Sequence, residues 1–168
     1  MIGIKQKAKA FFWKNELLFL LKFFAVFLVL QYLLLAFEPF FLENSLASFE
    51  ASLLGLGSKG NAVYIGEIPF VVSPNCSGLL SAAVFAAIVF ALKKPGLKGK
   101  IITTAIGAVS LFLLNIARLY VVLASGKAYG VQFAETVHVL SWFFVFGAVI
   151  AIWYALAKKS YGSFDGLL

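Results

Sequence analysis

The chain has 168 residues, of which 62% are hydrophobic and 12% are charged, and its mean hydropathy is +1.00. A soluble domain of this length cannot bury so much apolar surface, so the composition excludes the soluble classes and predicts one membrane-embedded domain. The formal net charge of +7 does not indicate nucleic-acid binding, because the lysines gather in segments that a membrane topology places on one side.

Four apolar runs approach the length of about 20 residues that a helix needs to cross a hydrocarbon core. They are Leu17–Phe37, Ser77–Leu92, Ile101–Ala124 and Val137–Ala157. The sequence therefore predicts an all-α polytopic membrane protein with four transmembrane helices, of which the second is near the short limit. The first run follows a basic segment but has no small-residue cleavage site, so we expect a membrane span and not a signal peptide.

Charged residues divide between the segments that flank these runs. Lysines fill the N-terminus, the loop after the second run and the C-terminus: Lys5, Lys7, Lys9, Lys14, Lys22, Lys93, Lys94, Lys98, Lys100, Lys158 and Lys159. Most acids lie in the connecting segments 38–75 and 125–136: Glu38, Glu43, Glu50, Glu67 and Glu135. The positive-inside rule therefore predicts a multi-pass protein of the cell membrane, with both termini in the cytoplasm and the acidic segments outside.

The first acidic segment is predicted to carry its own secondary structure. Apolar residues recur there at helical spacing, with Glu43 and Glu50 on other faces, which is typical of an amphipathic helix on a membrane surface; they are Leu42, Leu46, Phe49, Leu53 and Leu56. After this helix, Val63–Ile65 and Ile68–Val72 flank a two-residue connection. That pattern predicts a short β-hairpin with Gly66 as the first residue of a type II′ turn.

Cys76, the only cysteine, lies where the hairpin leads into the second apolar run. Ser73 or Asn75 is predicted to cap that helix, and Pro74 suits its first position. Free N–H groups and the helix dipole should lower the pKa of the thiol and stabilise the nucleophilic thiolate. The next two residues are small and leave room for a substrate backbone: Ser77 and Gly78.

Arg118 lies in the third run, about 9 Å from its predicted outer end. An arginine in hydrocarbon costs on the order of 3 kcal/mol, so it usually faces the bundle interior, has a partner and carries function. Asn115 is one turn earlier on the same face, and the two side chains are expected to act together. Arg118 is suited to hold a thiolate, a carbonyl oxygen or a carboxylate.

His138 opens the fourth run from the same predicted side of the membrane. A histidine is a natural proton carrier near neutral pH. Glu135 precedes it by three residues and is suited to orient its ring, although a solvated loop residue is the simpler interpretation of this glutamate. Ser141 follows His138 by three residues.

Each of these residues also has a structural explanation. A lone cysteine at a membrane boundary more often packs or carries a lipid, and a lone histidine at a helix start is more often an interfacial polar group. Together with Arg118 they favour function, because chance would scatter them over both membrane faces. One cysteine and one histidine are too few for a metal site, so neither a metal nor another cofactor is expected.

The ordered motifs resemble the archaeosortase/exosortase family. Its pattern is a Cys-Ser/Thr-Gly motif that opens one membrane helix, an Asn-x-x-Arg motif in the next, and a His or Arg that begins the one after. The matching residues are Asn75-Cys76-Ser77-Gly78, Asn115-Ile116-Ala117-Arg118 and His138. The resemblance covers residues 63–157, and the chain is shorter than many members, which have extra membrane helices.

The resemblance implies a cysteine-dependent membrane transpeptidase. Such enzymes cleave exported proteins that carry a C-terminal sorting signal, made of a short motif, a membrane helix and a basic tail. They are thought to pass the new C-terminus to a membrane lipid or another surface anchor; with water as acceptor the enzyme is a thiol protease. Carried over to this chain, Cys76 is the nucleophile, Arg118 the stabiliser and His138 the acid/base, with a supporting set of Asn75, Ser77, Gly78, Asn115 and Glu135.

Three other functions fit parts of the sequence. A non-enzymatic structural or assembly subunit of a membrane complex would use Cys76 for packing and Arg118 to bind an acid on another subunit. A carrier or channel would use Arg118 as an anion site, but apart from Lys22 the predicted spans hold no other charge. A membrane acyltransferase would use the same cysteine on a lipid ester or thioester.

Overall fold

A computed structural model describes residues 2–37, 40–73 and 76–161, and the side chains within those ranges from residue 14 to residue 159. Pro74 and Asn75, which the sequence assigns to a helix cap and to the site, lie outside the described residues. Five helices and three strands follow one another along the chain: α1 (Ile2–Ala36), α2 (Phe40–Leu54), β1 (Gly57–Lys59), β2 (Ala62–Ile65), β3 (Ile68–Val71), α3 (Leu79–Ala91), α4 (Leu97–Tyr129) and α5 (Val131–Tyr161).

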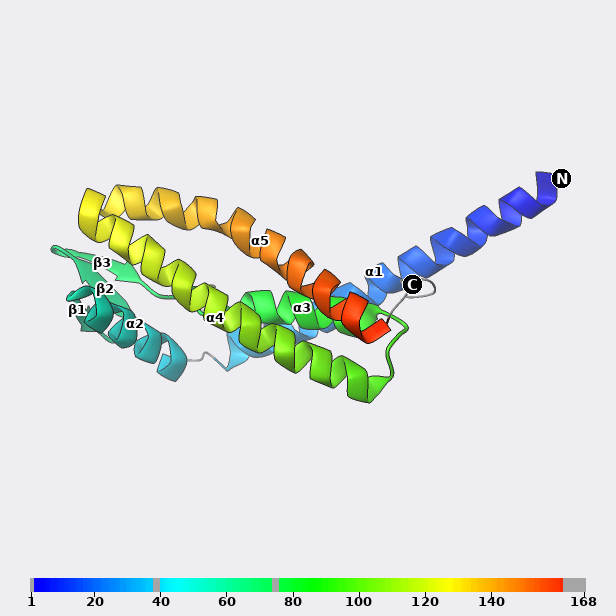
Figure 1. The fold of residues 1–168 in the computed structure, drawn as a ribbon, viewed down its shortest axis with the longest axis horizontal. Helices are drawn as coiled ribbons and strands as arrows, with labels where there is room; N and C mark the ends of the chain where they lie inside the picture. The colour runs from blue at the N-terminus through cyan, green and yellow to red at the C-terminus, as the bar shows by residue number, and fades with distance from the viewer. Residues whose placement is uncertain (1, 38–39, 74–75, 162–168) are drawn as a thin grey trace.

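The helices form a long, thin bundle (Figure 1). α4 and α5 make an antiparallel hairpin, and α3 packs against α1, α4 and α5. The sheet and α2 lie at the end of the bundle where α4 turns into α5, which we call the sheet end (Figure 1). At the other end of the bundle lie the N-terminal half of α1, the loop between α3 and α4, and the C-terminal end of α5 (Figure 1).

In the described part of the chain, three helices are long and apolar enough to cross a membrane: Lys14–Ala36, Leu97–Tyr129 and Val131–Lys159. The second predicted span, Ser77–Leu92, is not confirmed, because α3 has 13 residues and is only about 20 Å long. It is shorter than the predicted run at both ends. Gly78 takes a left-handed conformation with a φ of 82°, and Leu92 is extended.

The predicted loop between the third and fourth runs is largely helical. α4 continues to Tyr129 and α5 begins at Val131, so only Gly130 separates them. Gly130 has a φ of 93°, which an L side chain rarely adopts, and its N–H donates to the carbonyl of Gly126 at 2.8 Å. The two helices therefore extend beyond the predicted runs, and Arg118 is eleven residues from the end of α4 instead of six from the end of a span.

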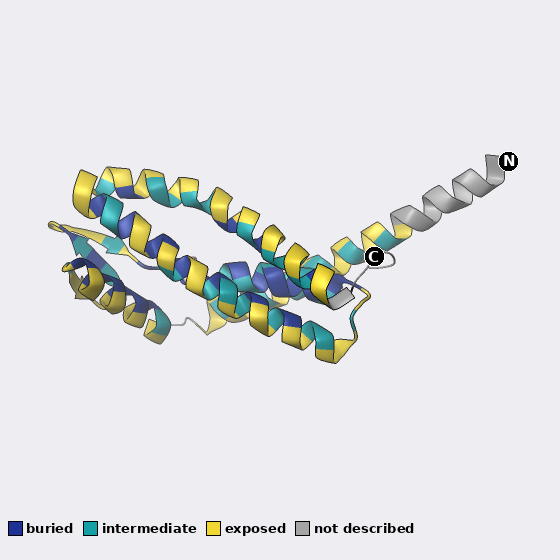
Figure 2. Ribbon diagram, viewed as in Figure 1, coloured by how far each residue is buried: buried dark blue, intermediate teal, exposed yellow. Residues whose placement is uncertain are grey.

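The amphipathic helix is present as α2, but its buried face is not the predicted one. Glu43 and Glu50, expected on other faces, are 2% and 0% exposed, whereas Phe49 and Leu53 are half exposed. The buried face of α2 consists of the two glutamates together with small and aliphatic residues, namely Leu46, Ala47, Ala51 and Leu54. The physical reason is that α2 packs against α4 and the sheet, so its largest side chains are left for the opposite surface (Figure 2).

The β-hairpin is confirmed, with an additional strand. β2 and β3 are antiparallel, Ile65 faces Ile68 across the turn, and β1 adds to the other side of β2. Gly66 has a φ of 66°, and no described residue other than glycine has a positive φ. A positive φ at the first turn residue alone fits the predicted type II′ turn.

Close helix packing joins α3 to α4 in the middle of the bundle. A side chain on Gly107 would meet the ring of the fully buried Phe85 at 2.1 Å. Nearer the opposite end, Lys100 of α4 donates to the carbonyls of Phe90 and Leu92, at 3.1 and 2.5 Å, and so caps the last turn of α3. These contacts fix how far α3 extends along α4, and therefore where the residues before α3 lie.

Candidate active site

Cys76 lies in a short turn between β3 and α3. Its N–H donates to the carbonyl of Ser73 at 2.8 Å, and the Ser73 hydroxyl lies 3.4 Å from Sγ. The predicted cap by Ser73 is wrong: α3 begins at Leu79, its N-cap is Gly78, and the N–H of Leu79 donates to the hydroxyl of Ser77 at 3.4 Å. The cysteine is therefore placed just before the helix by a turn of its own.

Asn115 of α4 holds this turn from the other side. Its Nδ2 donates a short hydrogen bond to the carbonyl of Cys76, and the side chain is 2% exposed. A Cβ on Gly78 would lie 3.0 Å from the Cβ of Asn115, so a glycine is needed here both for its positive φ and for this close approach. Ser77 is fully buried beside it.

Arg118 is bound through all of its guanidinium nitrogens. Nη1 donates to Asn115 Oδ1 at 3.2 Å, Nε donates to Ser141 Oγ at 2.6 Å, and Nη2 lies 3.3 Å from Nδ1 of His138. The guanidinium carbon lies 4.6 Å from the centre of the Trp142 ring. The expected pairing of Arg118 with Asn115 is present, and it links α4 both to the cysteine turn and to α5.

His138 is half-buried on α5 and faces this guanidinium. Arginine has no acceptor, so the contact requires that Nδ1 of His138 accepts and that the neutral ring carries its proton on Nε2. The ring also makes an edge contact with Phe70 of β3 at a centroid distance of 5.8 Å, and a second one with Trp142. The imidazole is thus held between α4, α5 and the sheet.

Cys76, Arg118 and His138 therefore belong to one network, which runs from the cysteine carbonyl through Asn115 and the guanidinium to the imidazole. Glu135 is not brought into it: the residue is exposed, and in the described part of the chain no hydrogen bond joins it to His138. Asn75 lies outside the described residues.

Two members of the network were not predicted as site residues, Ser141 and Trp142. Ser141 also donates to the carbonyl of His138 at 2.6 Å, so it orients both the histidine turn and Arg118. Its position, three residues after the histidine, was the available signal. Trp142, expected to be an interfacial or packing aromatic, follows by one residue and stacks on the cation.

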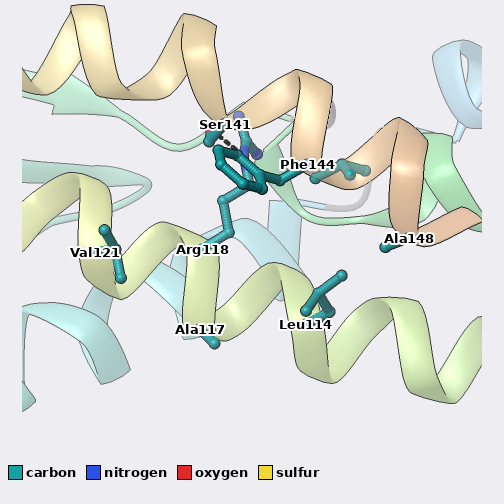
Figure 3. Close-up of a pocket in the computed structure, with 8 residues that line it drawn as sticks. Leu114, Ala117, Arg118, Val121, Ser141, Phe144 and Ala148 are labelled. Carbon is teal, nitrogen blue, oxygen red and sulfur yellow. Dashed lines mark hydrogen bonds between the residues drawn. The ribbon is translucent and has the colours of Figure 1, made fainter.

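The network borders an apolar cavity of about 370 Å³ between α4 and α5. Figure 3 shows Arg118 rising from α4 to Ser141, with apolar side chains of both helices around them. Arg118 and Ser141 are the polar members of a lining that otherwise consists of Leu114, Ala117, Val121, Phe144, Val145 and Ala148. A ligand in this cavity would therefore be largely apolar and would meet its polar contacts at the guanidinium.

A thiol, a guanidinium and an imidazole in one largely buried cluster can supply a nucleophile, an anion stabiliser and a proton carrier. The family model described as a transmembrane exosortase (Exosortase_EpsH) matches residues 7–155, a range that holds the whole cluster. No curated protein and no solved structure matches the chain.

Proposed function

This chain belongs to the transmembrane exosortase family, and from that premise we propose that it is a cysteine transpeptidase with Cys76 as nucleophile. Its substrates are exported proteins with a C-terminal membrane helix and a basic tail. It cuts them near the outer membrane surface and passes the new C-terminus to a membrane lipid or another anchor. Cys76, Arg118 and His138 carry the reaction, and Asn115 and Ser141 position them.

One observation carries this proposal: the guanidinium of Arg118 binds Asn115, which holds the cysteine turn, and on its other side meets the imidazole of His138. Placing a charged side chain in a membrane helix costs free energy, so such a residue usually has a function that explains why it is there. A guanidinium that lies between the cysteine turn and an imidazole is suited to acyl transfer, because the reaction develops negative charge on sulfur and then on oxygen. The apolar cavity beside Arg118 suits a substrate that arrives from the membrane.

The reaction starts with loss of the thiol proton to Nδ1 of His138, while Arg118 turns from the ring to the developing anion. The thiolate attacks the scissile carbonyl, and Arg118 stabilises the oxyanion of the tetrahedral intermediate. The imidazolium protonates the leaving nitrogen through Nε2, the carbon–nitrogen bond breaks, and a thioester remains on Cys76. An incoming amine or hydroxyl loses its proton to His138 and attacks the thioester, which releases the thiolate.

The direct test compares the C-termini of membrane proteins by mass spectrometry in cells that carry the wild-type chain and in cells that carry Cys76→Ala. We expect proteins with an intact C-terminal membrane helix and basic tail to accumulate in the mutant alone. Cys76→Ser is the matched variant, because it replaces only the sulfur by an oxygen and leaves a side chain of similar size at the same place. We expect it to lose nearly all processing as well, since a serine hydroxyl gives up its proton far less readily than a thiol and is a poorer nucleophile in the same place.

The opposite result has a clear meaning. If the membrane proteins of the two kinds of cells have the same C-termini, while the Cys76→Ala protein is made and inserted, the transpeptidase proposal is wrong. A structural subunit of a membrane complex would then be the better explanation, and Arg118 variants should lose that complex while Cys76 variants keep it.

A further inference from the structure

β3 forms an edge of the sheet that no other strand covers within the described residues. The strand order is β1-β2-β3, so β3 pairs with β2 on one side only. Its Ile68 and Val71 are 52% and 54% exposed. Two residues after β3, Ser73 begins the turn that holds Cys76, so this open edge leads directly to the proposed nucleophile.

The pairing pattern shows which backbone groups face the open side. The N–H of Val72 donates to the carbonyl of Asn61 at 2.8 Å, so residue 72 points its backbone groups toward the β2 side. In an antiparallel pair these orientations alternate along the strand. Val71 and Pro69 therefore point theirs away from β2, toward the open side, in the register that sets Val71 opposite Ala62 and Pro69 opposite Tyr64.

Pro69 limits where another strand can pair. Proline has no N–H, so on the open side it offers a carbonyl alone. Val71 offers both an N–H and a carbonyl, and it is the residue nearer to Cys76. Pro69 therefore prevents another strand from pairing along the whole of β3. A short segment can still pair with Val71, at the end of β3 next to the site.

The side chains beside this edge belong to the site. Phe70, between Pro69 and Val71, contacts the ring of His138 at a centroid distance of 5.8 Å. A strand added along β3 would place alternate side chains beside Phe70, on the face that carries the imidazole. The backbone of the added strand would pair with Val71, which precedes Cys76 by only five residues in the sequence.

We propose that the edge of β3 binds the substrate polypeptide next to the scissile bond as an added, extended strand, through the backbone N–H and carbonyl of Val71. The inference rests on the proposed function and names the binding site for the substrate segment outside the membrane helix. An extended peptide fits this edge, because its backbone carbonyl and N–H groups can pair with the N–H and carbonyl of Val71. The segment around the scissile bond must also be extended for the thiol to reach it. A lipid chain could use the apolar cavity but not this edge.

The test removes one hydrogen-bond donor. Val71→Pro deletes the N–H that faces the open side and leaves the bonds between β2 and β3 intact; Pro69, two residues earlier in the same orientation, shows that the strand accepts proline there. Val71→Thr is the matched control, because it keeps the N–H and the branched side chain. In cells, we expect Val71→Pro to slow conversion of the precursors that accumulate with Cys76→Ala by tenfold or more, and Val71→Thr to convert them at nearly the wild-type rate.

Labelling of Cys76 by a maleimide reports whether the site is intact, because the chain has no other cysteine. Slow conversion with normal labelling supports the proposal. Conversion by Val71→Pro at the rate of Val71→Thr overturns it, while the transpeptidase function stands on the Cys76→Ala result. If Cys76→Ala itself leaves every C-terminus unchanged, the proposed function fails, and the proposal about β3 fails with it.

A second measurement decides the case in which Val71→Pro disturbs the fold. A benzophenone amino acid replaces Val71 in the Cys76→Ala protein, and in a separate protein it replaces Leu113, an exposed residue of α4. After illumination we expect position 71 to crosslink the uncleaved precursors at residues directly before their membrane helix, and position 113 not to do so there. An absence of such crosslinks from position 71, in cells where precursors accumulate, overturns the proposal.

Discussion

Every nitrogen of the Arg118 guanidinium has its own contact, and the contacts come from two helices. Nε binds Ser141, Nη1 binds Asn115 and Nη2 meets His138. This planar fork does more than supply charge: it fixes the distance between the cysteine turn and the imidazole. A lysine has a single nitrogen at the end of a flexible chain and cannot make the three contacts together.

Arg118→Lys should therefore lose most of the activity although the charge is kept. We expect precursor conversion to slow by roughly 100-fold or more, the size of loss seen when a preorganised oxyanion donor is removed. Conversion is followed by pulse labelling of a precursor identified with Cys76→Ala. Ser141→Ala is the comparison, because it removes only the Nε contact and should cost clearly less. Near-normal conversion by Arg118→Lys would reduce this residue to a simple positive charge.

At the scale of elements, α2 carries an unusual buried acid. Glu50 is fully buried, and neither carboxylate oxygen has a hydrogen-bond partner. Burial raises the pKa of Glu50 from 4.5 to about 7. Because the folded state holds this proton more tightly than the unfolded state, the free energy of unfolding falls as the pH rises from 4.5 to about 7, and it levels off above that.

Glu50→Gln removes this dependence. We expect the variant to gain stability over the wild type as the pH rises through that window, by up to about 3 kcal/mol above pH 7. The measurement is the unfolding midpoint in detergent at a series of pH values from 4 to 8. Glu67→Gln, in the exposed turn of the β-hairpin, is the matched control and should follow the wild type. A constant difference between Glu50→Gln and the wild type at all pH values would contradict the buried, proton-binding state.

The packing of α3 on α4 depends on a glycine. A Cβ at position 107 would overlap the Phe85 ring, which is itself fully buried and has no free space to move into. Gly107→Ala should therefore destabilise the protein by about 1–3 kcal/mol, the usual cost of overpacking. Gly147→Ala in α5 is the control, since a Cβ there would meet nothing within 4 Å and alanine favours a helix. Unfolding midpoints in detergent that are equal for the two variants would show that α3 and α4 can move apart freely.

At the scale of the whole molecule, features set by local chemistry were predictable and features set by packing between elements were not. The β-hairpin and its turn follow from Gly66 and the flanking apolar residues, and the meeting of Cys76, Arg118 and His138 follows from the order of the helices. The burial of Glu50 does not follow from the sequence, because hydrophobicity assigns an acid to the solvent face and only α4 and the sheet decide otherwise.

Two lengths were also misjudged for physical reasons. The predicted run Ser77–Leu92 is mostly apolar, and its hydropathy does not show that Gly78 takes a positive φ and that α3 begins after it. Beyond residue 124, polar and small residues lower the hydropathy and suggest a loop, but the helix continues to Tyr129, where Gly126 packs closely against Ile65 and Ala134, and only Gly130 interrupts the backbone. Hydropathy predicts where a membrane span is, and it is a poor guide to where a helix ends.

Most lysines of the described chain lie at the end opposite the sheet, although Lys59 of β1 and Lys127 of α4 lie at the sheet end. Lys93, in the loop between α3 and α4, donates to Asn15 of α1 at 3.1 Å, so this part of α1 lies beside that loop. α5 ends at the same end of the molecule, with Lys158 and Lys159 in its last turn. The exposed Glu67 lies in the turn between β2 and β3 and the exposed Glu135 near the start of α5. Both of these segments are at the sheet end (Figure 1). The proposed function requires the sheet end to face the outside, where exported substrates are.

This orientation can be tested with single cysteines in a Cys76→Ala background, in which no other thiol is present. We expect Glu67→Cys, in the hairpin turn, to react with a membrane-impermeant maleimide in intact cells. Lys94→Cys, in the loop at the opposite end, should react only after the membrane is opened, because the positive-inside rule keeps that loop in the cytoplasm. The reverse pattern would place Cys76 on the cytoplasmic side, where exported proteins no longer pass, and it would contradict both the orientation and the sorting reaction built on it.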